Sequence, residues 1–176
     1  SQAITVEEAR QEAAYVIEQI APYRITYPVV FDWERQNYAG SRSQTIPDTD
    51  LLCSMANAFR ADIEAAGYEA MIYFYQNLAY NNLDLSQLLD YPFWLAQYTD
   101  YPSFYYDFDM WQYTSSGKVP GISGNVDLNL RFFRDGELPP EDSGDDEGTQ
   151  PSQDVASSQD GASEEEDTGS GISQDI

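Results

Sequence analysis

The sequence predicts an α/β fold built from parallel βα units. Segments with helical spacing alternate with short apolar segments that are typical of buried strands. The apolar density of these strands suits a sheet that is covered on both faces. All aromatic residues lie before Gly136, and a chain of 176 residues is long enough for one domain with a sizeable core.

The first helix is predicted to begin after Thr5, because Thr5 followed by Glu8 is a capping-box pattern. We expect this helix to end before Pro22. The residues that keep helical spacing are Val6, Ala9, Ala13, Val16, Ile17 and Ile20.

A short buried strand is expected at 28–32, followed by a second helix that Asp48 or Thr49 caps and Gly67 ends. The apolar face of that helix consists of Leu52, Met55, Ala56, Phe59 and Ile63. The further expected elements are strands at 70–75, 93–98, 109–113 and 125–128, with a short helix at 85–89.

The last part of the chain, 137–176, has a different composition. It contains 13 of the 31 acidic residues and no Lys or Arg, and Ser, Gly, Gln and Pro make up most of the rest. Such a segment buries too little apolar surface to offset its ordering entropy, so we predict a disordered acidic tail after a domain at 1–136.

Charge and composition exclude several classes of function. Residues 1–136 retain 18 acidic and 8 basic side chains, a surface that disfavours nucleic acid and anionic lipid as partners. We find no apolar run long enough to cross a bilayer and no signal-peptide pattern after Ser1. With no His and with Cys53 as the single cysteine, neither a zinc site nor a Cys–His nucleophile is expected.

The most informative motif is Phe31-Asp32-Trp33-Glu34, at the end of the first expected strand. Side chains alternate along a strand, so Asp32 and Glu34 should share one face, starting about 6.6 Å apart. Two carboxylates in one cleft favour a neutral acid beside an anion, the pair that glycoside hydrolysis uses. Alternatively, acidic residues at a strand end lie at a solvated rim or cap the next helix.

Several further segments decide between these alternatives by their order and spacing. They are Tyr27-Pro28-Val29-Val30 before the motif, Ala65-Ala66-Gly67-Tyr68, Met71-Ile72-Tyr73, Phe93-Trp94-Leu95-Ala96-Gln97-Tyr98, Trp111-Gln112-Tyr113-Thr114-Ser115 and Asn125-Val126-Asp127-Leu128-Asn129. Together with the acidic motif they resemble the glycoside hydrolase 25 family, the Chalaropsis-type muramidases, over about 5–133.

The resemblance implies a TIM-like (β/α) barrel and the hydrolysis of bacterial peptidoglycan between N-acetylmuramic acid and N-acetylglucosamine. It assigns Glu34 as general acid, Asp32 as the anion that assists the substrate's N-acetyl group, and Asp127 as a further acidic residue of the site. It implies no metal or organic cofactor. It also implies action outside the cell or at the cell wall, while no oligomeric state follows from the sequence.

Four other residues fall in segments that resemble the walls of the family's groove. Tyr73, Trp94 and Tyr98 are either sugar-stacking residues or packing residues of their strands. Gln112 is either a hydrogen-bonding group at the mouth of the barrel or a satisfied polar residue.

The resemblance begins at the helix before the acidic motif, so the family's opening strands and an early Asp have no counterpart in 1–176. We therefore expect an N-terminally truncated barrel with weak or no activity, and two exposed apolar sheet edges. Two alternatives stay open: a catalytically silent module that binds peptidoglycan, and another barrel glycosidase. A chitinase-like enzyme is disfavoured because the longer acidic motif of that family is absent around Asp32.

Overall fold

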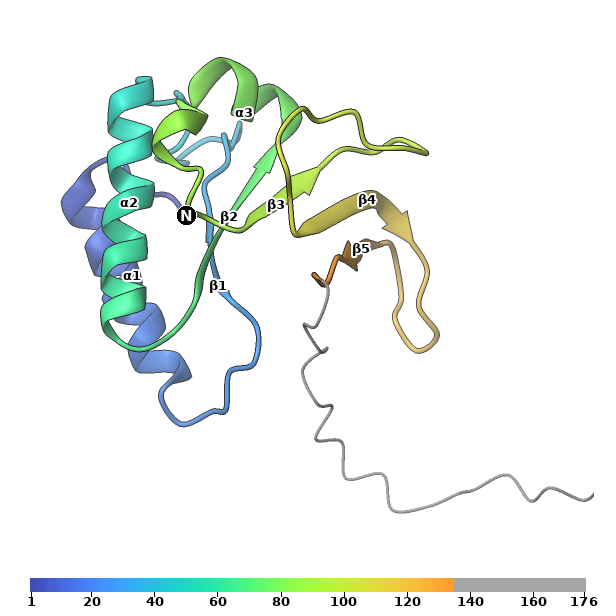
Figure 1. Ribbon diagram of the computed structural model, residues 1–176, viewed down its shortest axis with the longest axis horizontal. Coiled ribbons are helices and arrows are strands. Elements are labelled where there is room, and N and C mark those ends of the chain that lie inside the picture. The colour runs from blue at the N-terminus through green and yellow to red at the C-terminus, as the bar shows by residue number, and fades with distance from the viewer. Residues whose placement is uncertain (135–176) are drawn as a thin grey trace, which may run out of the picture. The chain divides into compact units, whose positions relative to one another are not determined.

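The computed structural model describes residues 1–134, so the predicted boundary at Gly136 and the acidic tail at 137–176 lie outside the described residues. The described chain forms helices and strands in the predicted alternation (Figure 1). In chain order they are α1 (Val6–Ile20), β1 (Val29–Asp32), α2 (Thr49–Ala65), β2 (Ala70–Tyr75), α3 (Gln76–Asn82), the 3-10 turn η1 (Leu85–Gln87), β3 (Phe93–Ala96), β4 (Met110–Gly117) and β5 (Val126–Arg131).

Both long helices begin where the sequence predicts. The Thr5 hydroxyl accepts a hydrogen bond from the Glu8 amide at 3.2 Å, and the Glu8 carboxylate accepts one from the Ile4 amide at 2.9 Å. Asp48 caps α2 by accepting from the Leu51 amide at 2.9 Å. After α2 the chain turns at Gly67, whose φ of +88° is a conformation that glycine adopts readily.

The five strands form one mixed sheet in the order β1-β2-β3-β4-β5. The first four strands are parallel, as the βα alternation predicts, but β5 pairs with β4 in the antiparallel direction. The alternation of helices and strands in the sequence did not predict this reversal. Only residues 118–125 connect β4 to β5, and a parallel crossover needs a dozen or more residues.

Four other boundaries differ from the predictions. Strand β3 ends at Ala96 rather than at 98, because the chain turns where the Thr99 amide donates to the Gln97 carbonyl at 3.0 Å. The predicted helix at 85–89 is the three-residue turn η1, and β4 and β5 run on to Gly117 and Arg131. The helix α3 was not predicted, since it follows β2 directly without a side-chain cap.

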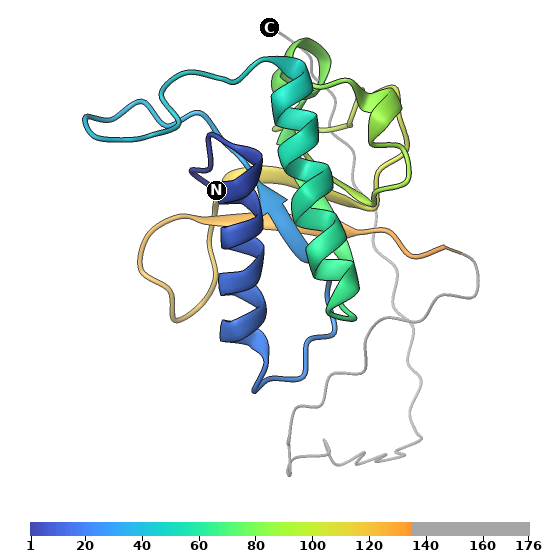
Figure 2. The ribbon, with the colours of Figure 1, turned by 90° about the vertical axis from the view of Figure 1, so that its left-hand side faces the viewer.

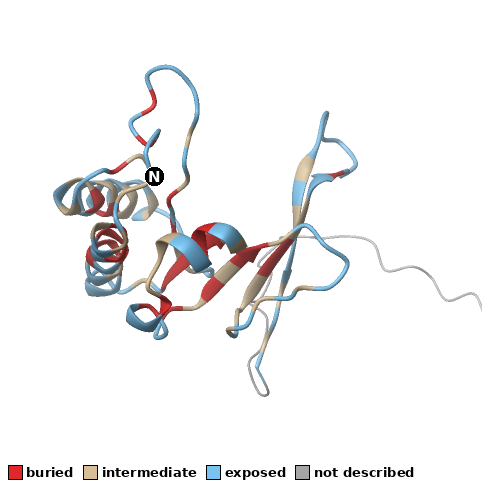
Figure 3. Ribbon diagram, turned by 90° about the horizontal axis from the view of Figure 1, so that it is seen from above, coloured by how far each residue is buried: buried red, intermediate tan, exposed pale blue. Residues whose placement is uncertain are grey.

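The core lies between the sheet and the pair α1 and α2, which run beside each other (Figures 1 and 2). Alternate strand residues point into it, among them Phe31, Ile72, Phe74 and Leu95, each at most 2% exposed. Figure 3 shows the buried residues concentrated at this side, with β4 and β5 farther from the helices. The expectation of a covered sheet therefore holds for the face under α1 and α2.

Strands β1 and β5 lie at the two edges of the sheet within the described residues, so the sheet is an open half-barrel there. The edge of β1 is partly occupied, since the Ser1 amine donates to the Asp32 carbonyl and the Trp33 indole donates to the Ala3 carbonyl at 2.8 Å. Leu130 and Phe132, at the other edge, are nearly half exposed. Within 1–134 no helix has the length and apolar character needed to cross a membrane.

Candidate active site

The acidic motif lies where β1 ends, and its side chains divide between the two faces of the sheet. Phe31 and Trp33 are 2% and 1% exposed and belong to the core under the helices. Asp32 is exposed and Glu34 is half-buried. This burial pattern agrees with the predicted alternation, which placed the two carboxylates together on the face opposite the core.

The surroundings of Glu34 favour its protonated form. Burial raises the pKa of Glu34 above its ordinary value, and the negative charges of Asp32 and, more weakly, Asp127 raise it further. The Ser1 amine opposes this effect in part. Because Asp32 and Asp127 both act on Glu34, the structure brings the three predicted acidic residues to one site.

Asp32 keeps contact with solvent, but protein atoms crowd its carboxyl group. Partial burial raises the pKa of Asp32, and the nearby Ser1 amine opposes that rise. No hydrogen-bond donor to this carboxylate is present among the described side chains. Asp32 therefore lies on the open face of the sheet next to the half-buried Glu34, and the pKa of both carboxyl groups is raised.

Tyr73 lies at the centre of the group. In the sheet it pairs with Asp32 on one side and Trp94 on the other. Burial raises the pKa of the Tyr73 phenol strongly, and the charges of Glu34, Asp32 and Asp127 add to this effect. Its ring meets the Trp94 ring edge to face, with 5.2 Å between ring centres.

Gln112 joins two of the predicted tyrosines. Its Oε1 accepts a hydrogen bond from the Tyr73 hydroxyl at 3.1 Å and another from the Tyr98 hydroxyl at 2.7 Å. Gln112 is only 4% exposed, so these bonds satisfy an otherwise buried acceptor. The residue thus fixes the positions of Tyr73 and Tyr98, in agreement with the reading of a satisfied polar residue.

A cavity of about 280 Å³ opens beside Glu34. Its lining consists of Glu34, Tyr73, Tyr75, Ala96 and Tyr98. Asp32, Trp94, Gln112 and Asp127 surround this group without lining the cavity. A half-buried acid among tyrosine rings can hold a polar, uncharged ligand and give it a proton.

Two residues of the site were missed at the sequence level. Tyr75 lines the cavity, and its place two residues after Tyr73 on β2 could have predicted a shared face. Asn129 accepts a hydrogen bond from the Trp94 indole at 3.0 Å. Asn129 lies two residues after Asp127, so the two side chains should share one face of their strand. This places Asn129 in the site only once β5 is known to pair with β4.

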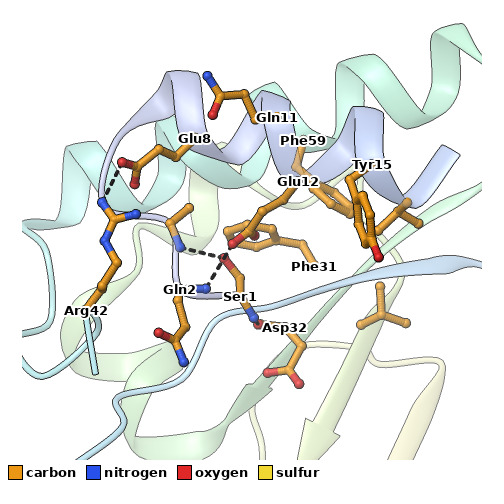
Figure 4. Close-up of a pocket in the computed structure, with 13 residues that line it drawn as sticks. Ser1, Gln2, Glu8, Gln11, Glu12, Tyr15, Phe31, Asp32, Arg42 and Phe59 are labelled. Atoms are coloured by element: carbon orange, nitrogen blue, oxygen red, sulfur yellow. Dashed lines mark hydrogen bonds and ion pairs between the residues drawn. The ribbon is translucent and has the colours of Figure 1, made fainter. Parts of the chain in front are cut away.

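A separate cavity of about 470 Å³ lies between α1 and the edge of β1 (Figure 4). Two of its three acidic residues have partners: Glu8 pairs with Arg42, and Glu12 accepts from the Gln2 amide at 3.0 Å. Figure 4 shows the carboxyl group of Asp32 turned away from the other lining residues. This cavity is thus distinct from the one beside Glu34.

No cluster of His, Cys, Asp and Glu suited to a metal ion occurs in the part of the chain that the structure describes. The charges of Asp32 and Asp127 raise the pKa of Glu34, but the three residues do not form such a cluster. The chemistry that this arrangement offers directly is proton transfer and electrostatic stabilisation by carboxyl groups.

Several solved structures of other proteins are similar to this chain. The modular autolysin LytC of Streptococcus pneumoniae matches with 30% identity and a TM-score of 0.65, over 74% of this chain and 32% of that one. The CTP1L endolysin matches with 29% identity and a TM-score of 0.59, over 73% and 43%. The spore cortex lytic enzyme SleM of Clostridium perfringens, at 20% identity and a TM-score of 0.56, shows the same fold over 74% and 46%.

This chain therefore spans between a third and a half of the length of these relatives. No curated protein sequence matched it. A sequence model described as "Glycosyl hydrolases family 25" matches residues 2–122, a range that includes every predicted site residue except Asp127. The chain belongs to glycosyl hydrolase family 25.

Proposed function

We propose that the chain is a muramidase domain that hydrolyses the β-1,4 bond between N-acetylmuramic acid and N-acetylglucosamine in peptidoglycan. The observation that carries this proposal is the pair at the end of β1. Glu34 is half-buried, with a pKa raised by burial and by the charge of Asp32, and Asp32 lies on the same face, where we assign it the role of the anion. Family membership and the likeness to an autolysin and an endolysin support it.

In the proposed reaction Glu34 gives its proton to the glycosidic oxygen as the bond to the anomeric carbon breaks. The carbonyl oxygen of the substrate's own N-acetyl group forms a bond to that carbon, and Asp32 stabilises the positive charge on the cyclic intermediate. Water then attacks the anomeric carbon and loses a proton to the Glu34 carboxylate. The N-acetyl group is released, and Glu34 returns to its acid form.

The other residues of the site hold the sugar chain. Tyr73, Trp94 and Tyr98 provide ring surfaces for sugar units, Gln112 positions two of these rings, and Asp127 adds negative charge near the reacting carbon. A structure of LytC contains a synthetic peptidoglycan ligand, which supports peptidoglycan as the partner. The proposed chemistry uses no metal or organic cofactor, and it acts outside the cell or at the cell wall.

The open edge of the sheet at β1 affects the rate of peptidoglycan cleavage that we expect. We assign 1–136 to the catalytic domain and infer that its sheet is part of a (β/α) barrel, with β1 as an edge strand in the described residues. Such a site is walled on one side only, so we expect slow cleavage by this chain. The same observation favours a second candidate function, that of a module that binds peptidoglycan without cleaving it.

Replacing Glu34 with Gln separates the two candidates. The experiment measures the release of reducing ends from purified peptidoglycan by the whole chain, by Glu34→Gln and by Glu18→Gln, a control on the exposed side of α1. A muramidase predicts loss of release in Glu34→Gln alone, with binding to sacculi retained. Binding without release in any variant would favour the module, and release from chitin in preference to peptidoglycan would favour a chitinase-like enzyme.

A further inference from the structure

A second hollow, of about 710 Å³, lies on the outer face of strands β4 and β5. Trp111 and Leu130 are paired across the two strands and line it. A bulge after Gln112 changes the alternation, so that Tyr113 and Thr114 line the same hollow. The hollow is therefore formed by residues of the face opposite Gln112.

No helix within residues 1–134 covers this part of the sheet. The connection from β3 to β4, residues 97–109, runs without a helix, and Figures 1 and 3 show α1 and α2 away from β4 and β5. The rings at the rim are therefore open to solvent: Tyr101 is 84% exposed and Tyr98 is 56% exposed. An exposed group of aromatic residues of this kind is typical of a binding surface.

The chemistry of the hollow narrows the class of ligand. Aromatic rings lie beside hydroxyl groups, and among the described residues of the lining Asp100 is the single charged one. With no Lys or Arg to offset Asp100, the hollow disfavours phosphate groups, nucleic acid and anionic lipid. Flat rings beside short polar groups suit neutral sugar units, whose apolar faces stack while their hydroxyl and amide groups form hydrogen bonds.

Tyr98 connects the hollow to the cavity beside Glu34. It lines both, and its hydroxyl donates to Gln112 on the site face. The cavity beside Glu34 and the hollow therefore share Tyr98 as a common wall.

We propose that this hollow is a second glycan-binding site, which holds further N-acetylated sugar units of the strand that the chain cleaves. Tyr101 and Tyr113 supply the stacking surfaces and Trp111 forms the floor. The proposal rests on the proposed function for the identity of the glycan. Its test is chosen to be independent of cleavage.

The test uses the full chain carrying Glu34→Gln, titrated with a β-1,4-linked N-acetylglucosamine tetramer. Binding is followed through the indole N–H signals of Trp94 and Trp111, which report on the site face and on the hollow respectively. Tyr101→Ala should lower the affinity read at Trp111 about tenfold, a loss typical of removing one stacked ring. Trp94 should keep its response, and Tyr101→Phe should retain the affinity.

The structure predicts that Tyr101→Ala leaves the fold intact. The ring is exposed, and the carbonyl of Tyr101, which accepts from the Thr99 hydroxyl at 2.8 Å, remains in the variant. Tyr23→Ala, at another exposed tyrosine (69%) outside the hollow, is the matched control.

Three results would overturn the inference: no response at Trp111, a response that Tyr101→Ala leaves unchanged, or an equal loss in Tyr23→Ala. None of these depends on whether the Glu34 form of the chain releases reducing ends. Failure of the second site and failure of the proposed function can thus be told apart.

Discussion

The two faces of β2 are built from one six-residue segment in which residues of both faces are buried, yet the two faces differ in their chemistry. Phe74 is fully buried and packs against Phe93 and Phe104, with 5.0 and 5.5 Å between ring centres. Its neighbours Tyr73 and Tyr75 point to the other face and line the cavity beside Glu34. One face stabilises the fold by apolar burial, while the other keeps partly desolvated carboxyl groups that cost stability and are suited to chemistry.

The largest effect expected is on catalysis and concerns the site face alone. Replacing Glu34 with Gln removes the proton donor, so cleavage should fall about 10²–10⁴-fold. Thermal stability should not fall, because the partly buried acid next to Asp32 is itself unfavourable. Reducing-end release and a thermal melt of the same samples check both outcomes, and a large drop in Tm would mean that Glu34 is a structural residue.

On the core face of β2 we expect a substitution to lower the stability of the fold. Phe74→Ala should lower the free energy of unfolding by about 3–5 kcal/mol, since it leaves a cavity among Phe93 and Phe104. Tyr75→Phe, the next residue along β2, removes only a hydroxyl on the site face and serves as the control. Urea unfolding measures both, and equal losses would show that the two faces are not energetically distinct.

A smaller effect is expected where the site face depends on its own hydrogen bonds. Gln112→Leu removes the acceptor of the Tyr73 hydroxyl and should cost about 1–3 kcal/mol, because that buried donor is left without a partner. Adding Tyr73→Phe removes the orphaned donor and should recover part of the loss. A double-mutant cycle of unfolding free energies tests this, and strict additivity would show that the bond contributes nothing.

The smallest effect expected is a shift in the pKa of Glu34. Asp32→Asn should lower the pKa of Glu34, since the charge of Asp32 helps to raise it, and Asp127→Asn should lower it less. A carboxyl whose pKa is raised in the folded state binds its proton more tightly there. Its contribution to stability is therefore complete at low pH and is lost as the pH rises through the raised pKa. An NMR titration of Glu34 gives the shift, and a rise on Asp32→Asn would exclude a charge contact between the two residues.

The sequence predicted local features and the strand-by-strand alternation well. The caps at Thr5 and Asp48 and the turn at Gly67 depend on short-range hydrogen bonds and φ preferences, which neighbouring residues determine. The separation of Asp32 and Glu34 from Phe31 and Trp33 follows from the two-residue period of a strand. Tyr73 and Gln112 were selected as separate candidates, but their hydrogen bond spans 39 residues and only the fold brings them together.

What the sequence did not predict depends on long-range pairing. The direction of β5 and the bulge after Gln112 determine which residues of β4 and β5 face the site and which face outward. Without them, Asn129 could not be placed beside Trp94, and Trp111, Tyr113 and Thr114 could not be grouped into one hollow. The helix α3 lacks a polar cap and follows β2 directly, so no local signal marks where it begins.

The most direct test of the account identifies the sugar at the reducing ends that the chain creates. Peptidoglycan is digested with the whole chain or with Glu34→Gln, reduced with borohydride and analysed by mass spectrometry. The proposed muramidase activity predicts new reducing ends of N-acetylmuramic acid, formed slowly and only when Glu34 is present. New ends of N-acetylglucosamine, or no release above that of Glu34→Gln, would contradict it.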